Sequence, residues 1–142
     1  MKRRRFFPTI LSTIVTVGIA AFAVGELHAQ TADQPKAIST LLLEQKLEGL
    51  PGYVMQVVLV EGPPGWVGGR HYHPGHLFGY ILEGSYEFNF ADMTSRTVGP
   101  GEVFYETPNT VMRSRNGSST EWVKDVVFLL LREGDPGAVS VD

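Results

Sequence analysis

The sequence predicts an all-β fold, and three of its features carry that prediction. Short apolar and β-branched runs recur along most of the chain, turn-forming residues separate them at regular spacing, and no long helical pattern lies between them. Short strands in this arrangement are typical of an antiparallel sandwich or barrel. We therefore expect a domain built from short strands around one core.

The first predicted strand covers residues 53–61, between a glycine and a Gly-Pro-Pro-Gly turn. Residues 77–83 and 86–90 flank a Glu-Gly-Ser turn, and the second of these runs alternates aromatic with polar residues, as a half-buried strand does. The series is completed by shorter runs at residues 96–98, 103–105, 111–114 and 121–131, with turn residues between them.

A short helix is expected before these strands. Residues 30–36 are polar and small and predict a disordered lead. Residues 38–47 carry apolar side chains at helix-compatible spacing, and Gly49, Pro51 and Gly52 end that run. We therefore expect a lead with a short helix over residues 30–50 and the main domain over residues 51–142.

The first 29 residues have the pattern of a secretory signal peptide. A basic stretch at residues 2–5 precedes an apolar stretch at residues 10–24, and Ala29 stands at the predicted cleavage point. The alternatives are an uncleaved membrane anchor and a buried helix. Arg3-Arg4-Arg5-Phe6-Phe7 also resembles the twin-arginine export pattern. We expect a periplasmic or secreted protein that has no membrane segment in its mature form.

The composition excludes several classes of function. The chain has 12 Lys and Arg against 15 Asp and Glu; four basic residues and one acidic residue lie in residues 1–29, so eight basic and fourteen acidic residues remain. An acidic domain without a basic patch is unsuited to nucleic acid, so no nucleic-acid partner is expected. The absence of cysteine excludes disulfides and thiolate chemistry. The remaining length suits one compact domain.

Three histidines within six residues form the candidate site. Residues i and i+2 of a strand point to one face about 7 Å apart, so His71 and His73 can converge on one metal ion or one ligand. The alternative is a histidine cluster in an exposed loop beside Pro74. His76 faces away in a regular strand and joins the pair only if a bulge near Pro74 turns it inward.

The spacing around the pair resembles the first motif of the cupin superfamily. That motif is Gly, five residues, His-x-His, three or four residues, Glu, six residues, Gly. Gly65, His71, His73 and Gly84 stand at its positions, whereas Leu77 stands where the glutamate would be. The chain is thus similar to small single-domain cupins of the cupin 2 type. The resemblance implies a double-stranded β-helix, also called a jelly roll or cupin barrel, following the short N-terminal helix.

The second cupin motif is only partly present. It is Gly, five residues, Pro-x-Gly, two residues, His, three residues, Asn, and it can be traced from Gly101 to Asn116, where only these two residues match. Met112 stands at its histidine position. The resemblance therefore implies a degenerate metal site, in which two of four usual ligands are replaced. A thioether is a soft donor that suits Cu(I), and a methionine in a barrel also serves as a core filler.

The expected ligands of a divalent transition metal (Zn, Ni, Cu, Fe or Mn) are therefore His71, His73, His76 and Met112. We expect an exported small cupin that binds such a metal or a small organic ligand in its barrel through His71 and His73, with little or no turnover. Two alternatives stand beside it. One is a metal-dependent enzyme of the dioxygenase, isomerase or decarboxylase type, and the other is a metal-free structural module.

Strand alternation also predicts a homodimer. If His71 and His73 face inward, Leu77 shares their face, whereas Phe78 and Tyr80 point outward. An apolar outer face needs a cover, and a second copy of the chain would supply one. The alternative is that residues 38–50 of the same chain fold over that face.

The signal-peptide interpretation predicts a native protein that begins near Gln30 in the periplasm or outside the cell, because the basic and apolar stretches direct export and cleavage. Mass spectrometry of the native protein from separated cell fractions checks this. An intact Met1 in the cytoplasmic fraction would contradict it.

Overall fold

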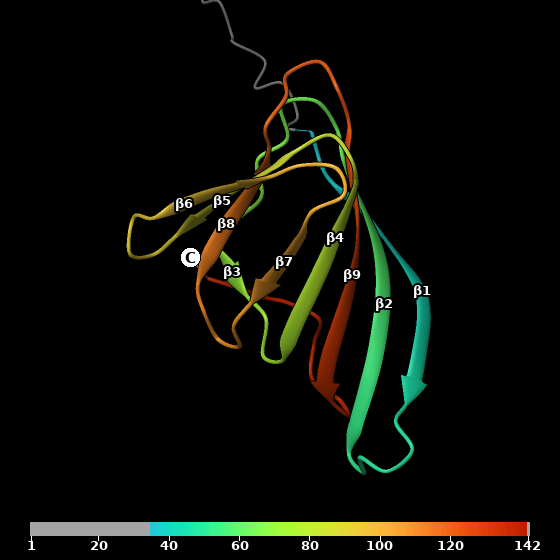
Figure 1. Cartoon of the computed structure of the whole chain (residues 1–142). Coiled ribbons are helices and arrows are strands. Elements are labelled where there is room, and N and C mark those ends of the chain that lie inside the picture. The colour runs from blue at the N-terminus through green and yellow to red at the C-terminus, as the bar shows by residue number, and fades with distance from the viewer. Residues whose placement is uncertain (1–34, 142) are drawn as a thin grey trace, which may run out of the picture. The chain divides into compact units, whose positions relative to one another are not determined.

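The computed structural model describes residues 35–141, and ten strands of this part build two five-stranded antiparallel sheets (Figure 1). Sheet A has the order β1-β2-β9-β4-β7 and sheet B the order β10-β3-β8-β5-β6. The strands of sheet A are β1 (Ile38–Lys46), β2 (Tyr53–Gly62), β9 (Val123–Arg132), β4 (His76–Glu83) and β7 (Val103–Glu106). The strands of sheet B are β10 (Val139–Ser140), β3 (His71–Tyr72), β8 (Met112–Asn116), β5 (Tyr86–Phe90) and β6 (Ser95–Val98).

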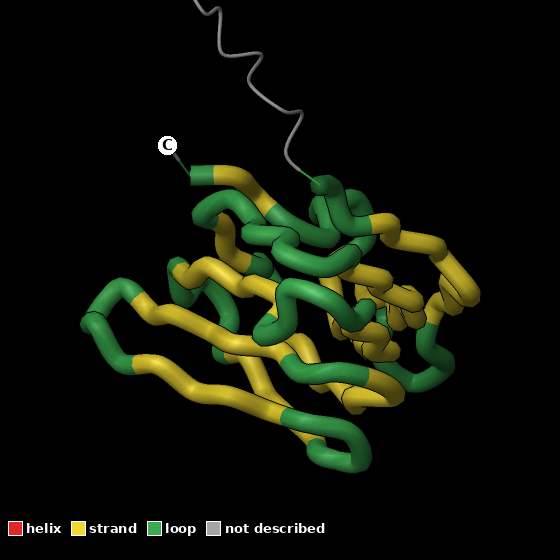
Figure 2. The backbone as a smooth tube through the Cα atoms, turned by 90° about the horizontal axis from the view of Figure 1, so that it is seen from above, coloured by secondary structure: helices red, strands yellow, loops and turns green. Residues whose placement is uncertain are grey.

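Side-chain alternation creates the core between the two sheets, which appear as separate layers when seen from above (Figure 2). Every second residue of β4 and of β9 is buried, as the period of two requires. The residues of the core are Val54, Leu77, Ile81, Tyr86, Phe88, Val98, Phe104, Met112, Val123, Val127, Leu129 and Leu131. The predicted inward orientation of Leu77 is confirmed, and Ile81 is buried on the same side of β4.

Gly79 occupies the inner position of β4 between these two side chains. A Cβ atom at Gly79 would lie 2.0 Å from the ring of Phe104, which is closer than any real contact. The Phe104 ring therefore fills the space that a larger residue at position 79 would take. Gly79 and Phe104 are directly opposite each other in the β4–β7 pair, so the ring lies over the glycine.

The predicted helix at residues 38–47 is wrong, because these residues form strand β1. The strand pairs with β2 from Ile38 opposite Glu61 to Lys46 opposite Val54. The chain reverses through Gly49 and other turn residues, and β1 then satisfies the edge hydrogen-bonding groups of β2. All residues of β1 are exposed, so the helix-like spacing of its apolar side chains does not correspond to a buried face. No helix occurs anywhere in residues 35–141.

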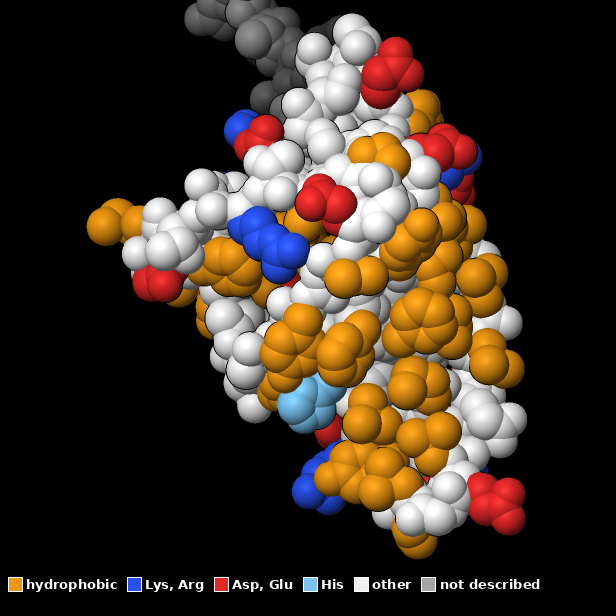
Figure 3. Space-filling model, in the orientation of Figure 1, with side chains coloured by type: hydrophobic (Ala, Val, Ile, Leu, Met, Phe, Trp, Pro, Cys, Tyr) orange, Lys and Arg blue, Asp and Glu red, His pale blue; other side chains and the backbone are white. Residues whose placement is uncertain are grey.

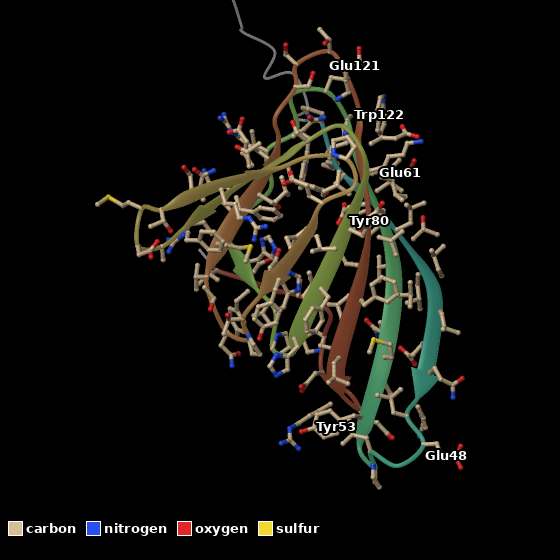
Figure 4. All side chains as sticks on the ribbon, viewed as in Figure 1. Glu48, Tyr53, Glu61, Tyr80, Glu121 and Trp122 are labelled. Atoms are coloured by element: carbon tan, nitrogen blue, oxygen red, sulfur yellow. The ribbon has the colours of Figure 1, made fainter. Side chains whose placement is uncertain are left out.

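The outer face of sheet A is apolar, and residues 38–50 do not fold over it. They extend the same sheet at its edge, which contradicts the alternative of an internal cover. Figure 3 shows apolar side chains gathered over this face, and Figure 4 shows Tyr80 of β4 on it. The exposed large apolar side chains of β4, β7 and β9 on this face are Phe78, Tyr80, Leu82, Val103, Tyr105 and Phe128.

The predicted signal peptide and most of the predicted lead lie outside the described residues. Within the described part, no helix has the length and apolar character needed to cross a membrane.

Candidate functional site

A cavity of about 390 Å³ lies between the two sheets, and side chains from both sheets line it. This volume is within the range of small-molecule sites. Most of the wall is apolar. The apolar side chains of the wall belong to Val58, Val60, Trp66, Leu77, Phe88, Phe104, Val127 and Leu129. The polar side chains belong to Ser39, Gln56, His71, His73, Tyr86, Glu106, Ser114 and Asp125.

His71 and His73 line this cavity together, as the strand spacing predicted. Their ring centroids are 5.0 Å apart and the ring planes are nearly perpendicular, at 88°. The Nδ1 atom of His71 is 2.9 Å from the carbonyl oxygen of Gly69, and that of His73 is 2.6 Å from the carbonyl oxygen of Gly137. A carbonyl only accepts hydrogen bonds, so each Nδ1 carries a proton and donates it. In the neutral ring each Nε2 therefore keeps a free lone pair.

Segments from distant parts of the sequence hold the two histidines in place. His71 pairs with Met112 of β8 on one side and with Ser140 of β10 on the other. The carbonyl oxygen of His73 accepts a hydrogen bond of 2.8 Å from the backbone N–H of Asn109, in the turn before β8. The histidine segment is therefore clamped by the β7–β8 turn and by the C-terminal strand. Burial of the His73 ring lowers its pKa, which favours the neutral imidazole.

Glu106 is a site residue that the sequence analysis missed. Its Oε2 atom lies 3.2 Å from Nε2 of His73, and the side chain is only 6% exposed. The contact is within ion-pair range, yet its geometry leaves Oε2 without a hydrogen-bond partner in the described part of the chain. Burial, aided by the charge of Asp125, raises the pKa of Glu106 to about 8. Strand alternation could have indicated Glu106, because Phe104 and Glu106 are the inward residues of β7. The predicted strand ended at residue 105 and therefore left Glu106 out.

Asp125 is a second buried carboxyl group on the cavity wall, and it was also missed. It is 2% exposed, and its Oδ1 atom has no hydrogen-bond partner among residues 35–141. Burial raises the pKa of Asp125 to about 7, against the opposing effect of a hydrogen bond from Tyr86. Burial and the same aspartate raise the pKa of Tyr86 above its usual value, so the phenol stays protonated and donates. The inward positions of β9 indicate this residue, because Asp125 lies between Val123 and Val127.

The other residues predicted for the site lie in different surroundings. Leu77 lines the cavity beside the histidines, as expected from the motif register. His76 faces the outer side of β4, where its Nδ1 is 2.7 Å from the hydroxyl of Tyr105 and the two rings stack. Met112 is buried opposite His71 in the core, but it borders a separate hollow with Arg70 rather than this cavity. The structure therefore brings His71 and His73 together but does not bring His76 or Met112 to their cavity.

The donor set of the cavity fits a divalent metal in part. The two free Nε2 atoms are suitable donors, and their Nδ1–H groups donate to carbonyl oxygens, as metal-binding histidines commonly do. Glu106 supplies an unpartnered carboxyl oxygen beside one of them. No three His, Cys, Asp or Glu side chains of the described chain are close enough together to form a ready cage. The residues therefore fit an ion held mainly by two imidazoles.

Two antiparallel sheets that enclose a cavity form a small β-sandwich. Sequence comparison then indicates the family. Residues 58–124 match the family described as the Cupin domain. Residues 58–124 are therefore a cupin domain. Among curated proteins, none matches the sequence.

Solved structures show the same fold at low sequence identity. An uncharacterized conserved protein with a double-stranded beta-helix domain from Klebsiella pneumoniae has a TM-score of 0.58 at 19% identity, covering 87% of this chain and 97% of its own. A cupin-like protein from Thermotoga maritima has a TM-score of 0.61 at 20% identity, covering 74% of this chain and 75% of its own. The DMSP lyase DddQ from Ruegeria pomeroyi has a TM-score of 0.59 at 22% identity, covering 82% of this chain and 56% of its own.

The raised pKa of Asp125 predicts that the metal-free protein loses stability as the pH rises. The folded state holds the proton up to about pH 7, whereas the unfolded chain releases it near pH 4. The stabilisation is complete below pH 4 and is lost as the pH rises through 7, by at most about 4 kcal/mol. Asp125→Asn should make the free energy of unfolding fall less steeply with pH. The loss of stability that remains in this variant should come from Glu106 and extend to about pH 8.

Urea unfolding between pH 4 and pH 9 in the presence of a chelator measures this effect. The matched control is Asp135→Asn in the turn after β9, which should retain the wild-type decline. An equal decline in Asp125→Asn and in the wild type would show that Asp125 ionises normally in the folded protein.

Proposed function

We propose that this protein is an exported small cupin that binds a divalent transition metal ion in its barrel through His71 and His73, with little or no turnover. The observation that carries the proposal is the pair of Nε2 atoms that face one cavity while both Nδ1 atoms are fixed to backbone carbonyls. Such fixation sets the tautomer that a metal requires before the metal arrives.

The affinity of this site is expected to be modest. Typical tight sites use three or four protein ligands, whereas here two imidazoles and one nearby carboxyl group are the available donors. Imidazole donors suit Zn, Cu, Ni and Fe, and the combination of two histidines with one carboxylate also suits Fe(II). When bound, such an ion supplies a Lewis-acid centre. The chain's own contribution is to orient the imidazoles and to surround them with an apolar wall.

Export of the protein remains part of the proposal. It is supported by the basic and apolar stretches at the start of the sequence.

A homodimer through the outer face of sheet A is also proposed. The aromatic side chains of this face, which include Phe78 and Phe128, are 41–51% exposed. Charged residues of β9 occupy the ends of the face, at Lys124 and Arg132. A second copy of the same face is self-complementary, because the apolar centre of one copy would cover that of the other.

His73→Ala is expected to remove most zinc binding by the metal-free protein, because one of two imidazole donors is lost. Loss of one ligand should weaken binding by about tenfold or more. Isothermal titration with Zn(II) and Ni(II), on protein without a histidine tag, measures the change. The matched control is His76→Ala, which removes a histidine three residues away whose ring pairs with Tyr105 outside the cavity.

Glu106→Gln keeps the size of the side chain and removes its charge, so we expect a smaller loss of affinity with an intact fold. If His76→Ala weakens metal binding as much as His73→Ala, or if neither ion binds the wild type, the metal proposal is wrong.

Phe128→Glu is expected to convert a dimer into a monomer, because it places a charge at the centre of the outer face of sheet A. Light scattering coupled to size-exclusion chromatography gives the mass of each form. Met93→Glu, in the turn between β5 and β6 of the other sheet, is the matched control and should stay dimeric. A monomeric wild type at high micromolar concentration would contradict the dimer.

A further inference from the structure

The cavity has a second polar end, away from the histidines. Across β4, Leu77 lies opposite Glu106 on one side and Leu129 on the other, whereas Ile81 lies opposite Asp125. Asp125 is therefore four residues along β9 from the level of Glu106, which is roughly 13 Å of strand. Sheet B has the same offset. His71 lies opposite Met112 at the start of β8, and Tyr86 lies opposite Asn116 at its end.

Asp125 presents an unused hydrogen-bond acceptor at this second end. Oδ1 has no hydrogen-bond partner in residues 35–141, although the side chain is 98% buried. A buried polar atom without a partner costs free energy that folding alone does not recover. Because Asp125 lines the cavity, a molecule that occupies this space can supply the missing donor.

The surroundings of Asp125 define the chemistry of such a molecule. Between the two ends the wall is apolar, and the aromatic rings of Trp66, Phe104 and Phe88 cluster around Tyr86 and each other. None of the described residues that line the cavity is Lys or Arg. The wall therefore offers carboxyl groups and aromatic faces, both of which attract a cation, and has no fixed positive group for an anion.

We infer that the cavity takes a small organic amine, whose apolar body lies along the aliphatic and aromatic wall and whose ammonium head donates to Oδ1 of Asp125. Tyr86 is a positioning residue that orients the carboxyl group. The amine site uses residues at the opposite end of the cavity from the histidines. The amine inference does not depend on the metal proposal and is tested separately.

Three six-carbon probes that differ only in their head groups test this inference. Hexylamine, 1-hexanol and hexanoate are titrated calorimetrically into the full mature protein at pH 7.5, with a chelator present so that bound metal plays no part. Hexylamine should bind about tenfold or more tightly than 1-hexanol, because its hydrogen bond is charge-assisted. Hexanoate should bind most weakly. Equal binding of amine and alcohol, tightest binding of hexanoate, or binding of none of the three overturns the inference.

Variants then locate the head group. Asp125→Asn should reduce the affinity for hexylamine about tenfold or more and change that for 1-hexanol less than about twofold. Ser114→Ala, on the same cavity wall, is the matched control and should keep the preference for the amine. Tyr86→Phe should reduce that preference partly, and it serves as the second test if Asp125→Asn does not fold. An amine preference that survives both Asp125→Asn and Tyr86→Phe overturns the assignment to Asp125.

Discussion

The alternation of side chains along β4, β7 and β9 is the constraint on which the rest of this structure depends. In sheet A, β4, β7 and β9 send alternate residues into the space between the sheets, and β8 of sheet B does the same from the other side. Most of these inner residues are apolar and close the core. Among the polar exceptions, Glu106 and Asp125 are carried to the interior by the same period and are buried without full hydrogen bonding. The polar content of the cavity thus follows directly from strand register.

Buried carboxyl groups of this kind weaken a fold, because burial disfavours their charged form and leaves acceptors unsatisfied. A domain of about 100 residues has little stability to spare. Their position on the wall of one cavity, beside two histidines fixed by backbone carbonyls, is therefore best explained by binding. The histidine end of the cavity suits a metal ion, and the Asp125 end suits a hydrogen-bond donor.

Much of the fold could be predicted from the sequence. The strand pattern and the motif spacing gave the all-β class, the inward side of β4 and the convergence of His71 and His73. The error at β1 has a physical cause: its apolar side chains are exposed, so their spacing reports no buried face, and pairing with the edge of β2 decides the structure. The motif spacing does not include Glu106 and Asp125, because register across three strands determines which carboxyl groups reach the cavity.

The central claim is that His71 and His73 share one ion. Anomalous diffraction from crystals of metal-stripped protein soaked in Co(II) or Zn(II) tests it most directly. One strong peak is expected in the cavity, about 2.0–2.3 Å from Nε2 of both histidines. A cavity without a peak, or a peak bound only by His76 on the outer face of β4, would contradict it.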